Sequence, residues 1–188
     1  MPVLVITGQS GAGKGTLIER LLQRFPQLEL AVSATTRERR RGERDRVHYY
    51  FISPAEFERR LAGDEFLEYH VFPWGQRSGT LSSEIERIAA DGRVCVLELE
   101  TEGALAVADR VSEAVTIFIT APIDELERRL RERATESAGE IGERLDLAES
   151  QLLQASLFDH VVENDDVERA LDELVAIVEA VRKDRDDR

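Results

Sequence analysis

The chain has 188 residues, of which 42% are hydrophobic and 34% charged, a composition typical of one globular domain. Its formal net charge of −13 argues against broad nucleic-acid binding, and no apolar run reaches the roughly 20 residues that a membrane span needs. Cys95 is the only cysteine, which excludes an internal disulfide and a cysteine metal cluster. We expect a cytoplasmic protein, monomeric or a small homo-oligomer, that binds neither nucleic acid nor membranes.

Strands and helices alternate along the chain. In chain order, the patterns predict a strand at 3–7, a helix at 16–25, strands at 28–33 and 48–52, helices at 54–61 and 82–90, a strand at 94–99, a helix at 101–111, a strand at 115–119, helices at 122–133 and 141–157, a strand at 160–163 and a helix at 167–181. This order predicts an α/β fold whose central parallel sheet is flanked by helices. The charged stretches 37–48 and 131–144 interrupt that framework, and we expect them to be flaps over a central cleft.

A glycine-rich segment follows the first strand. Residues 8–14 read GQSGAGK and fit the pattern G-x-x-x-x-G-K. Glycine permits backbone angles that turn several N–H groups toward one point, and the N-terminus of the next helix adds its own donors. We therefore expect a phosphate-binding loop made of Gly8, Gln9, Ser10, Gly11, Ala12, Gly13, Lys14, Gly15 and Thr16. The alternative is a turn that binds no ligand.

Magnesium usually accompanies such a loop, held by a Ser or Thr directly after the lysine. Here that residue is Gly15, so the metal would use Thr16 or be held mainly through water and phosphate oxygens.

Six arginines fall within ten positions, although the chain as a whole is acidic. Few acids separate them, so the cluster predicts a local anion site rather than only a solvated charge run. Its members are Arg37, Arg39, Arg40, Arg41, Arg44 and Arg46.

These segments together resemble guanylate kinase, of the nucleoside monophosphate kinase group. The pieces, in order, are GQSGAGKGT, VSATTRERRRGE, HYYF, EFLEY, VLELETEG, RLRERATES with IGERL, and VVENDD. The resemblance implies a P-loop kinase with Mg²⁺ as cofactor, which transfers the γ-phosphate of ATP to GMP. It also implies a single domain with a core at 1–32, 82–130 and 145–183, a GMP-binding subregion at 33–81 and a lid at 131–144.

The resemblance assigns residues to the acceptor, GMP. Arg37 and Arg40, with Tyr49, would grip its phosphate, because the planar fork of arginine donates two parallel bonds to phosphate oxygens. A carboxylate accepts from both N1–H and N2–H of guanine, a pair that adenine lacks. Glu68 would supply the carboxylate that recognises guanine, and Ser33, Thr80 and Glu100 would make further contacts with the base. The alternatives are a surface glutamate at a helix end for Glu68 and a strand-end cap for Ser33.

The resemblance also assigns residues to ATP. Lys14 reaches the β- and γ-phosphates, while Arg133 and Arg144, with Arg129 less closely matched, would close over the triphosphate and offset charge in the transition state. Surface salt bridges on a helix are the alternative for these arginines. Asn164 would contact adenine, or serve only in a turn. Glu98 and Glu100 stand where the family commonly has two aspartates, near the metal and the acceptor base.

The chain departs from the family pattern around the acceptor. Arg39 replaces a usual proline, Ala134 a usual glycine, and Arg77-Ser78-Gly79 stands where Tyr-Tyr-Gly is common. Ser78 would then replace a phosphate-binding tyrosine, with Arg77 as a possible substitute donor. Two other functions stay open: a related P-loop kinase with a different acceptor, and a non-catalytic guanylate-kinase-like binding module. The retained Gly13-Lys14 argues against the module.

Overall fold

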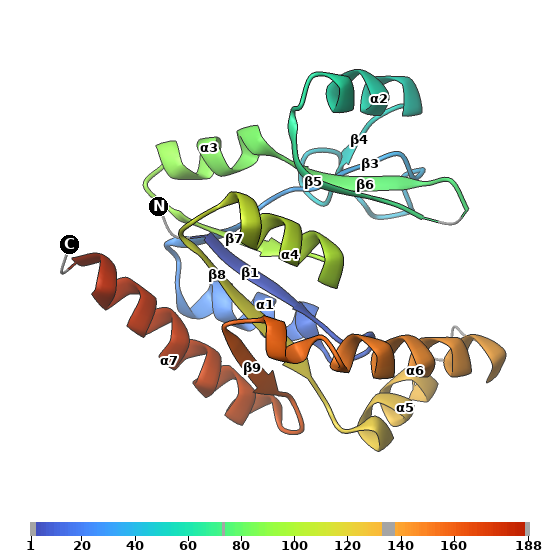
Figure 1. The fold of residues 1–188 in the computed structure, drawn as a ribbon, viewed down its shortest axis with the longest axis vertical. Helices are drawn as coiled ribbons and strands as arrows, with labels where there is room; N and C mark the ends of the chain where they lie inside the picture. Colours follow the sequence, from blue (N-terminus) through green and yellow to red (C-terminus); the bar gives the residue numbers. More distant parts are fainter. Residues whose placement is uncertain (1–2, 73, 133–137, 187–188) are drawn as a thin grey trace.

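A five-stranded parallel sheet forms the centre of the molecule (Figure 1). The computed structural model describes residues 3–72, 74–132 and 138–186. Every pair of neighbouring strands in this core sheet is parallel, in the order β2-β7-β1-β8-β9. The strands are β1 (Val3–Gly8), β2 (Leu28–Leu30), β7 (Val94–Glu98), β8 (Ala114–Thr120) and β9 (His160–Glu163). The predicted α/β class with a central parallel sheet is confirmed.

Helices cover both faces of the core sheet, which explains why its inner strands carry so little charge. Leu4 and Ile6 of β1 pack in one hydrophobic core with residues of α1 (Lys14–Arg24) and α7 (Val167–Asp186). The alternate residues Val3 and Val5 pack in a second core with α3 (Ser82–Ala90) and α4 (Thr101–Arg110). The period of two along a strand therefore builds two cores on opposite faces.

A second, four-stranded sheet lies beyond α3 and α4, together with α2 (Pro54–Ala62) (Figure 1). Its order is β4-β3-β6-β5, and β5 and β6 form an antiparallel pair. It has a small core of its own, made of Ala34, Phe57, Phe66 and Leu81. The strands are β3 (Ala34–Thr35), β4 (Tyr50–Phe51), β5 (Phe66–Val71) and β6 (Arg77–Leu81). β3, β5 and β6 were not predicted from the sequence, and the strand predicted at 48–52 is shorter in the structure, at Tyr50–Phe51.

The C-terminal part supplies three further helical segments. α5 (Ile123–Glu132) follows β8, and α6 (Ala138–Leu152) packs beside it. The helix expected at 141–157 ends early, because a separate 3-10 turn occupies Ala155–Leu157. Part of the expected lid, residues 133–137, lies outside the described residues. No helix in the described ranges is both long and apolar enough to cross a membrane.

Candidate active site

The glycine loop joins β1 to α1 through a very close backbone contact. Gly8 has a φ of 140°, and a Cβ there would lie 2.0 Å from the carbonyl oxygen of Ile119 on β8. Gly11 and Gly13 also have positive φ, at 85° and 86°. Only glycine adopts these angles without strain, so the chain can turn tightly over the end of the sheet.

The N-terminus of α1 is left open by this turn. Gly13 is the N-cap, and no side chain among the described residues forms a capping hydrogen bond with the helix. The first amides of a helix lack partners within the helix and carry the positive end of its dipole. Lys14 arches back over the loop, where its Nζ donates to the carbonyl oxygens of Gly8 at 2.8 Å and Gln9 at 3.0 Å. Amides and one ammonium group thus converge at a place suited to phosphate.

Helix α6 is fastened to the glycine loop at three points. The buried side chain of Gln9 donates to the carbonyl of Ala148 at 3.0 Å and accepts from Thr120 and Ala121. The amide of Ser10 donates to Oε1 of Gln151 at 2.9 Å. Nε of Arg144 donates to the Ser10 hydroxyl at 3.0 Å. The side chain of Gln9 therefore supports the loop from behind.

A cavity of about 510 Å³, called here the outer cavity, opens on the far side of the loop. Asn164 lines it and is 1% exposed; its Nδ2 donates to the Ala12 carbonyl at 2.6 Å. Its Oδ1 has no hydrogen-bond partner among the described residues, so it can accept a bond from a ligand. Arg129 donates to the carbonyls of Ala12 and Asn164, which joins the loop to the strand end after β9.

A second cavity of about 450 Å³, the loop cavity, lies directly over the glycine loop. It brings together residues far apart in the sequence, including Lys14, Thr16, Glu98, Glu100 and Arg144. Of the arginines expected here, Arg144 lines this cavity, whereas Arg129 lines the outer cavity on the other side of the glycine loop. Arg133 lies outside the described residues.

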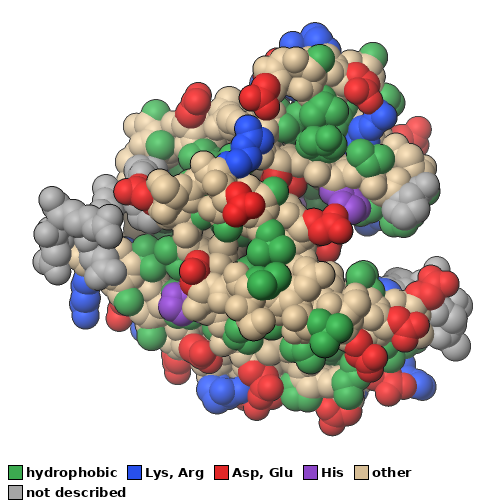
Figure 2. All heavy atoms as spheres, viewed as in Figure 1, with side chains coloured by type: hydrophobic (Ala, Val, Ile, Leu, Met, Phe, Trp, Pro, Cys, Tyr) green, Lys and Arg blue, Asp and Glu red, His purple; other side chains and the backbone are tan. Residues whose placement is uncertain are grey.

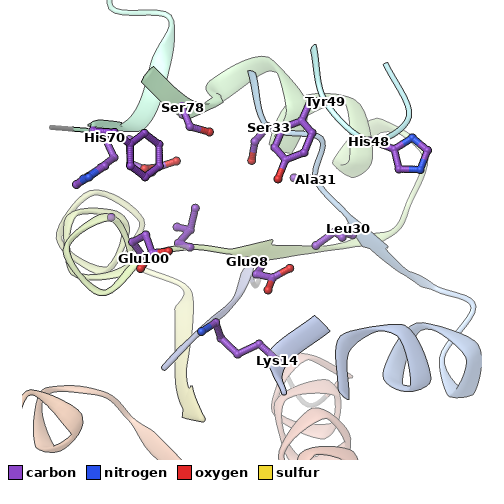
Figure 3. A pocket seen from close by; sticks show the side chains of 15 residues that line it. Lys14, Leu30, Ala31, Ser33, His48, Tyr49, His70, Ser78, Glu98 and Glu100 are labelled. Carbon is purple, nitrogen blue, oxygen red and sulfur yellow. The ribbon is translucent and has the colours of Figure 1, made fainter. Parts of the chain in front are cut away.

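A third cavity, the inter-sheet cavity, has a volume of about 290 Å³ and separates the core sheet from the second sheet. Figure 2 shows the surface hollowed between these two parts of the molecule, with acidic side chains and a histidine near the opening. In Figure 3, Ser33, Tyr49 and Ser78 lie on the side of the second sheet, while Lys14 and Glu98 lie on the side of the core sheet. The side chains Lys14, Glu98 and Glu100 line both this cavity and the loop cavity.

Glu68 enters the inter-sheet cavity from β5, and not from a helix end. Its side chain is 8% exposed, and Oε1 accepts from the Thr80 amide at 2.8 Å. Burial raises the pKa of this carboxyl group, although the hydrogen bond from the Thr80 backbone amide acts in the opposite direction. The Thr80 hydroxyl is buried and has no hydrogen-bond partner within the described part of the chain. The Glu68 carboxylate and the Thr80 hydroxyl can therefore bind a flat polar group that offers both hydrogen-bond donors and an acceptor.

Two acids, Glu98 and Glu100, lie at and just after the end of β7, where ligands of parallel sheets bind. Glu98 remains accessible to solvent, yet the surrounding protein raises its pKa, and Lys14 opposes that effect. Glu100 directly precedes α4, and the side-chain nitrogen Nε2 of Gln151 lies 3.5 Å from Oε2 of Glu100. Both acids thus stand at the boundary between the loop cavity and the inter-sheet cavity.

The expected phosphate grip is only partly assembled. Arg37 donates to both carboxylate oxygens of Glu43, at 2.7 and 3.0 Å, and its guanidinium lies 5.2 Å from the centre of the Tyr49 ring. This ion pair lowers the pKa of Glu43 to about 2. Arg40 is exposed, and neither Arg37 nor Arg40 lines the inter-sheet cavity, whereas Tyr49 does.

Arg77, the possible substitute for the missing tyrosine, does not line the inter-sheet cavity in this structure. Its guanidinium pairs with Glu58 on α2 at 2.6 Å and lies over the Phe57 ring, away from the cavity. The sequence analysis also gave no role to His48 and His70, which line the cavity. His48 belongs to the HYYF segment, so its place beside Tyr49 was a usable signal.

Further lining residues were missed because they depend on tertiary contacts. Phe72 and Gly103 approach the cavity from β5–β6 and from α4, and the β5–β6 pair itself had not been predicted.

Comparison with known proteins points to one family. A protein-family model described as guanylate kinase matches residues 1–181. The guanylate kinase of Desulfitobacterium hafniense (strain Y51) is 42% identical over 177 residues, which cover 94% of this chain and 88% of that protein. For the guanylate kinase of Synechococcus elongatus, the identity is 42% over 177 residues, with 94% and 96% covered. The crystal structure of guanylate kinase from Anaplasma phagocytophilum superposes with a TM-score of 0.74 at 27% identity, over 95% of this chain and 84% of that one.

Proposed function

This chain belongs to the guanylate kinase family and is an ATP:GMP phosphotransferase, and on this premise we propose how its residues divide the reaction. The observation that supports the division is the shared boundary of two cavities. Lys14, Glu98 and Glu100 line both the loop cavity and the inter-sheet cavity. A triphosphate in the first and a monophosphate in the second would meet at Lys14.

The transfer itself needs little covalent chemistry from the protein. An oxygen of the GMP phosphate attacks the γ-phosphorus, and the bond from that phosphorus to the β–γ bridging oxygen breaks, which leaves ADP and GDP. The attacking phosphate is already anionic, so no strong general base is required. Catalysis consists of positioning and charge neutralisation. We assign neutralisation to Lys14 and Arg144, and also to Arg133 from the sequence alone.

Residues of the glycine loop bind the ATP phosphates in this proposal. The open amides at the start of α1 supply the donors, along residues 8–16. Asn164 would face the adenine end, because it lines the outer cavity and its Oδ1 has no hydrogen-bond partner in the part of the chain that the structure describes. Arg129 acts indirectly, since it holds the loop against the strand end after β9.

Guanine would be read at the bottom of the inter-sheet cavity. The carboxylate of Glu68 accepts from N1–H and N2–H, and the unpartnered Thr80 hydroxyl offers a further polar contact. Ser33 and Glu100 also line this cavity. A site built this way rejects a base without the donor pair, because its own buried polar groups would stay unpaired.

The acceptor phosphate would be gripped by Tyr49, Arg37 and Arg40. Tyr49 already lines the cavity, whereas both arginines lie outside it. Closure of the second sheet toward the core would bring them in, and it would also exclude water from the transfer. We accordingly divide the chain into a core (1–32, 82–130, 145–183), an acceptor subregion (33–81) and a lid (131–144).

Magnesium fits the donors of the loop cavity. Thr16, Glu98 and Glu100 offer oxygen atoms there, the ligands that this cation prefers. No three His, Cys, Asp or Glu side chains among the described residues gather into a metal site, so most ligands would come from phosphate oxygens and water. When bound, the ion neutralises charge on the β- and γ-phosphates. We propose the cytoplasm as the location, because both nucleotides are metabolites of the cell interior.

A coupled assay of ADP release tests this assignment. We expect turnover with GMP and dGMP, and far weaker turnover with AMP, CMP and UMP. Inosine monophosphate, which keeps N1–H but lacks the N2 amino group, should fall between these groups. Equal activity with AMP and GMP would refute the reading of guanine by Glu68.

A further inference from the structure

Glu68 is held between a strand and a helix. Its Oε1 accepts from the Thr80 amide of β6 at 2.8 Å. Its other oxygen, Oε2, faces Gly103 in the first turn of α4. Glu68 is only 8% exposed, so its carboxylate is enclosed by these two elements. The position of Oε2 therefore depends on what residue 103 presents.

A side chain at residue 103 would enter the space that Glu68 occupies. A Cβ on Gly103 would lie 2.8 Å from Oε2 and 3.4 Å from Cδ of Glu68. Carbon–oxygen contacts normally begin at about 3.3 Å. Either the carboxylate or the helix would have to move if any other residue stood there.

Backbone geometry does not account for this glycine. Gly103 is absent from the positive-φ glycines of the described chain, unlike Gly8, Gly11 and Gly13. It lies in the first turn of α4, and glycine favours a helix less than alanine does. The feature of the structure that requires glycine here is the close approach of the Glu68 carboxylate.

We infer that Gly103 is a positioning residue that determines acceptor specificity, because the absence of its side chain leaves Oε2 of Glu68 free to stand where guanine can reach it. This inference rests on the proposed reading of guanine by Glu68. Oε2 is the far end of a flexible side chain, so it yields more easily than the helix backbone. A methyl group at residue 103 therefore displaces the carboxylate and leaves the fold intact.

The test compares Gly103→Ala with the unaltered chain. We expect the KM for GMP to rise at least about tenfold, since small misplacements of a positioning group cost that much or more. The kcat at saturating GMP and the affinity for ATP by calorimetry should stay near their original values, and the thermal midpoint should not fall, because alanine favours the helix more than glycine does. Ala106→Gly, on the exposed side of the same helix, is the matched control. It changes helix propensity without contacting Glu68 and should leave the KM unchanged.

A double-mutant cycle separates this inference from the function on which it rests. If Gly103 acts through Glu68, Gly103→Ala should add little to the KM of a Glu68→Gln variant. Should Glu68→Gln alone leave the KM for GMP unchanged, the proposed role of Glu68 fails. Should that variant raise the KM while Gly103→Ala does not, only the inference about Gly103 is overturned. Fully additive effects would also overturn it.

Discussion

Replacement of Glu68 by glutamine removes one negative charge and almost no volume. In the present structure, Oε1 accepts from the Thr80 amide, Oε2 lies beside Gly103, and both Glu68 and Gly103 line the inter-sheet cavity. If the amide oxygen of glutamine keeps the bond to Thr80, its NH₂ group points at two guanine donors. A hydrogen bond to a charged group contributes about 1.5–3 kcal/mol. We therefore expect a loss of about 3 kcal/mol in acceptor recognition, which corresponds to roughly 100-fold in kcat/KM for GMP.

The coupled ADP-release assay measures this loss, and calorimetry with ATP shows whether the loop cavity is intact. The same charge change on an exposed helix position, Glu86→Gln, serves as control and should leave kcat/KM unchanged. The thermal midpoint of Glu68→Gln should stay the same or rise, because burial already disfavours the charged form. A Glu68→Gln enzyme with less than a threefold loss for GMP would refute the assignment.

Three further outcomes follow from the same geometry. Lys14→Ala should lower kcat by about 100-fold or more in the ADP-release assay while the circular dichroism spectrum is retained, because one donor to the developing charge is lost; near-normal turnover would contradict its role. Gln9→Leu leaves several buried partners without their bond, at about 1–3 kcal/mol each, so thermal denaturation should show a midpoint lower by several degrees; an unchanged midpoint would argue against this support. Because the pKa of Glu68 is raised above the ordinary 4.5 of a glutamate, the KM for GMP should begin to increase, as the pH falls, before pH 4.5 is reached. In the linked stability, the folded state binds this proton more tightly than the unfolded chain, so this contribution is full below pH 4.5 and is lost as pH rises through the raised pKa. A KM for GMP that does not rise as the pH is lowered toward 4.5 would count against ionised Glu68 as the group that recognises guanine.

The core sheet was predictable because local pattern and tertiary environment agree there. β1 and β8 are continuous apolar runs, and helices cover both of their faces. The second sheet was not predictable in the same way. β5 reads FLEYHV without alternation, and β6 contains Ser78 and Gly79, which favour strands poorly. These strands form because they pair with one another, a contact that no short window of sequence contains.

The candidate site shows a similar division. The glycine loop follows from local sequence, since its conformation is set by glycines at fixed spacing. The local sequence does not predict which acids form ion pairs with the arginines. Arg37 pairs with Glu43, and Arg77 turns toward Glu58, because acids brought near by the fold compete for each guanidinium. The close approach of Gly103 to Glu68 joins elements 35 positions apart and is visible only in three dimensions.

The common boundary formed by Lys14, Glu98 and Glu100 has a consequence for inhibitor design. One compound would span the outer cavity, the loop cavity and the inter-sheet cavity if it carried adenosine at one end, guanosine at the other and a chain of phosphates between them. Such a tethered ligand loses translational freedom once, whereas two separate nucleotides lose it twice. Such a compound should bind poorly to kinases that have no carboxylate at the position of Glu68 in the inter-sheet cavity. The N1–H and N2–H donors of its guanine would find no acceptor there.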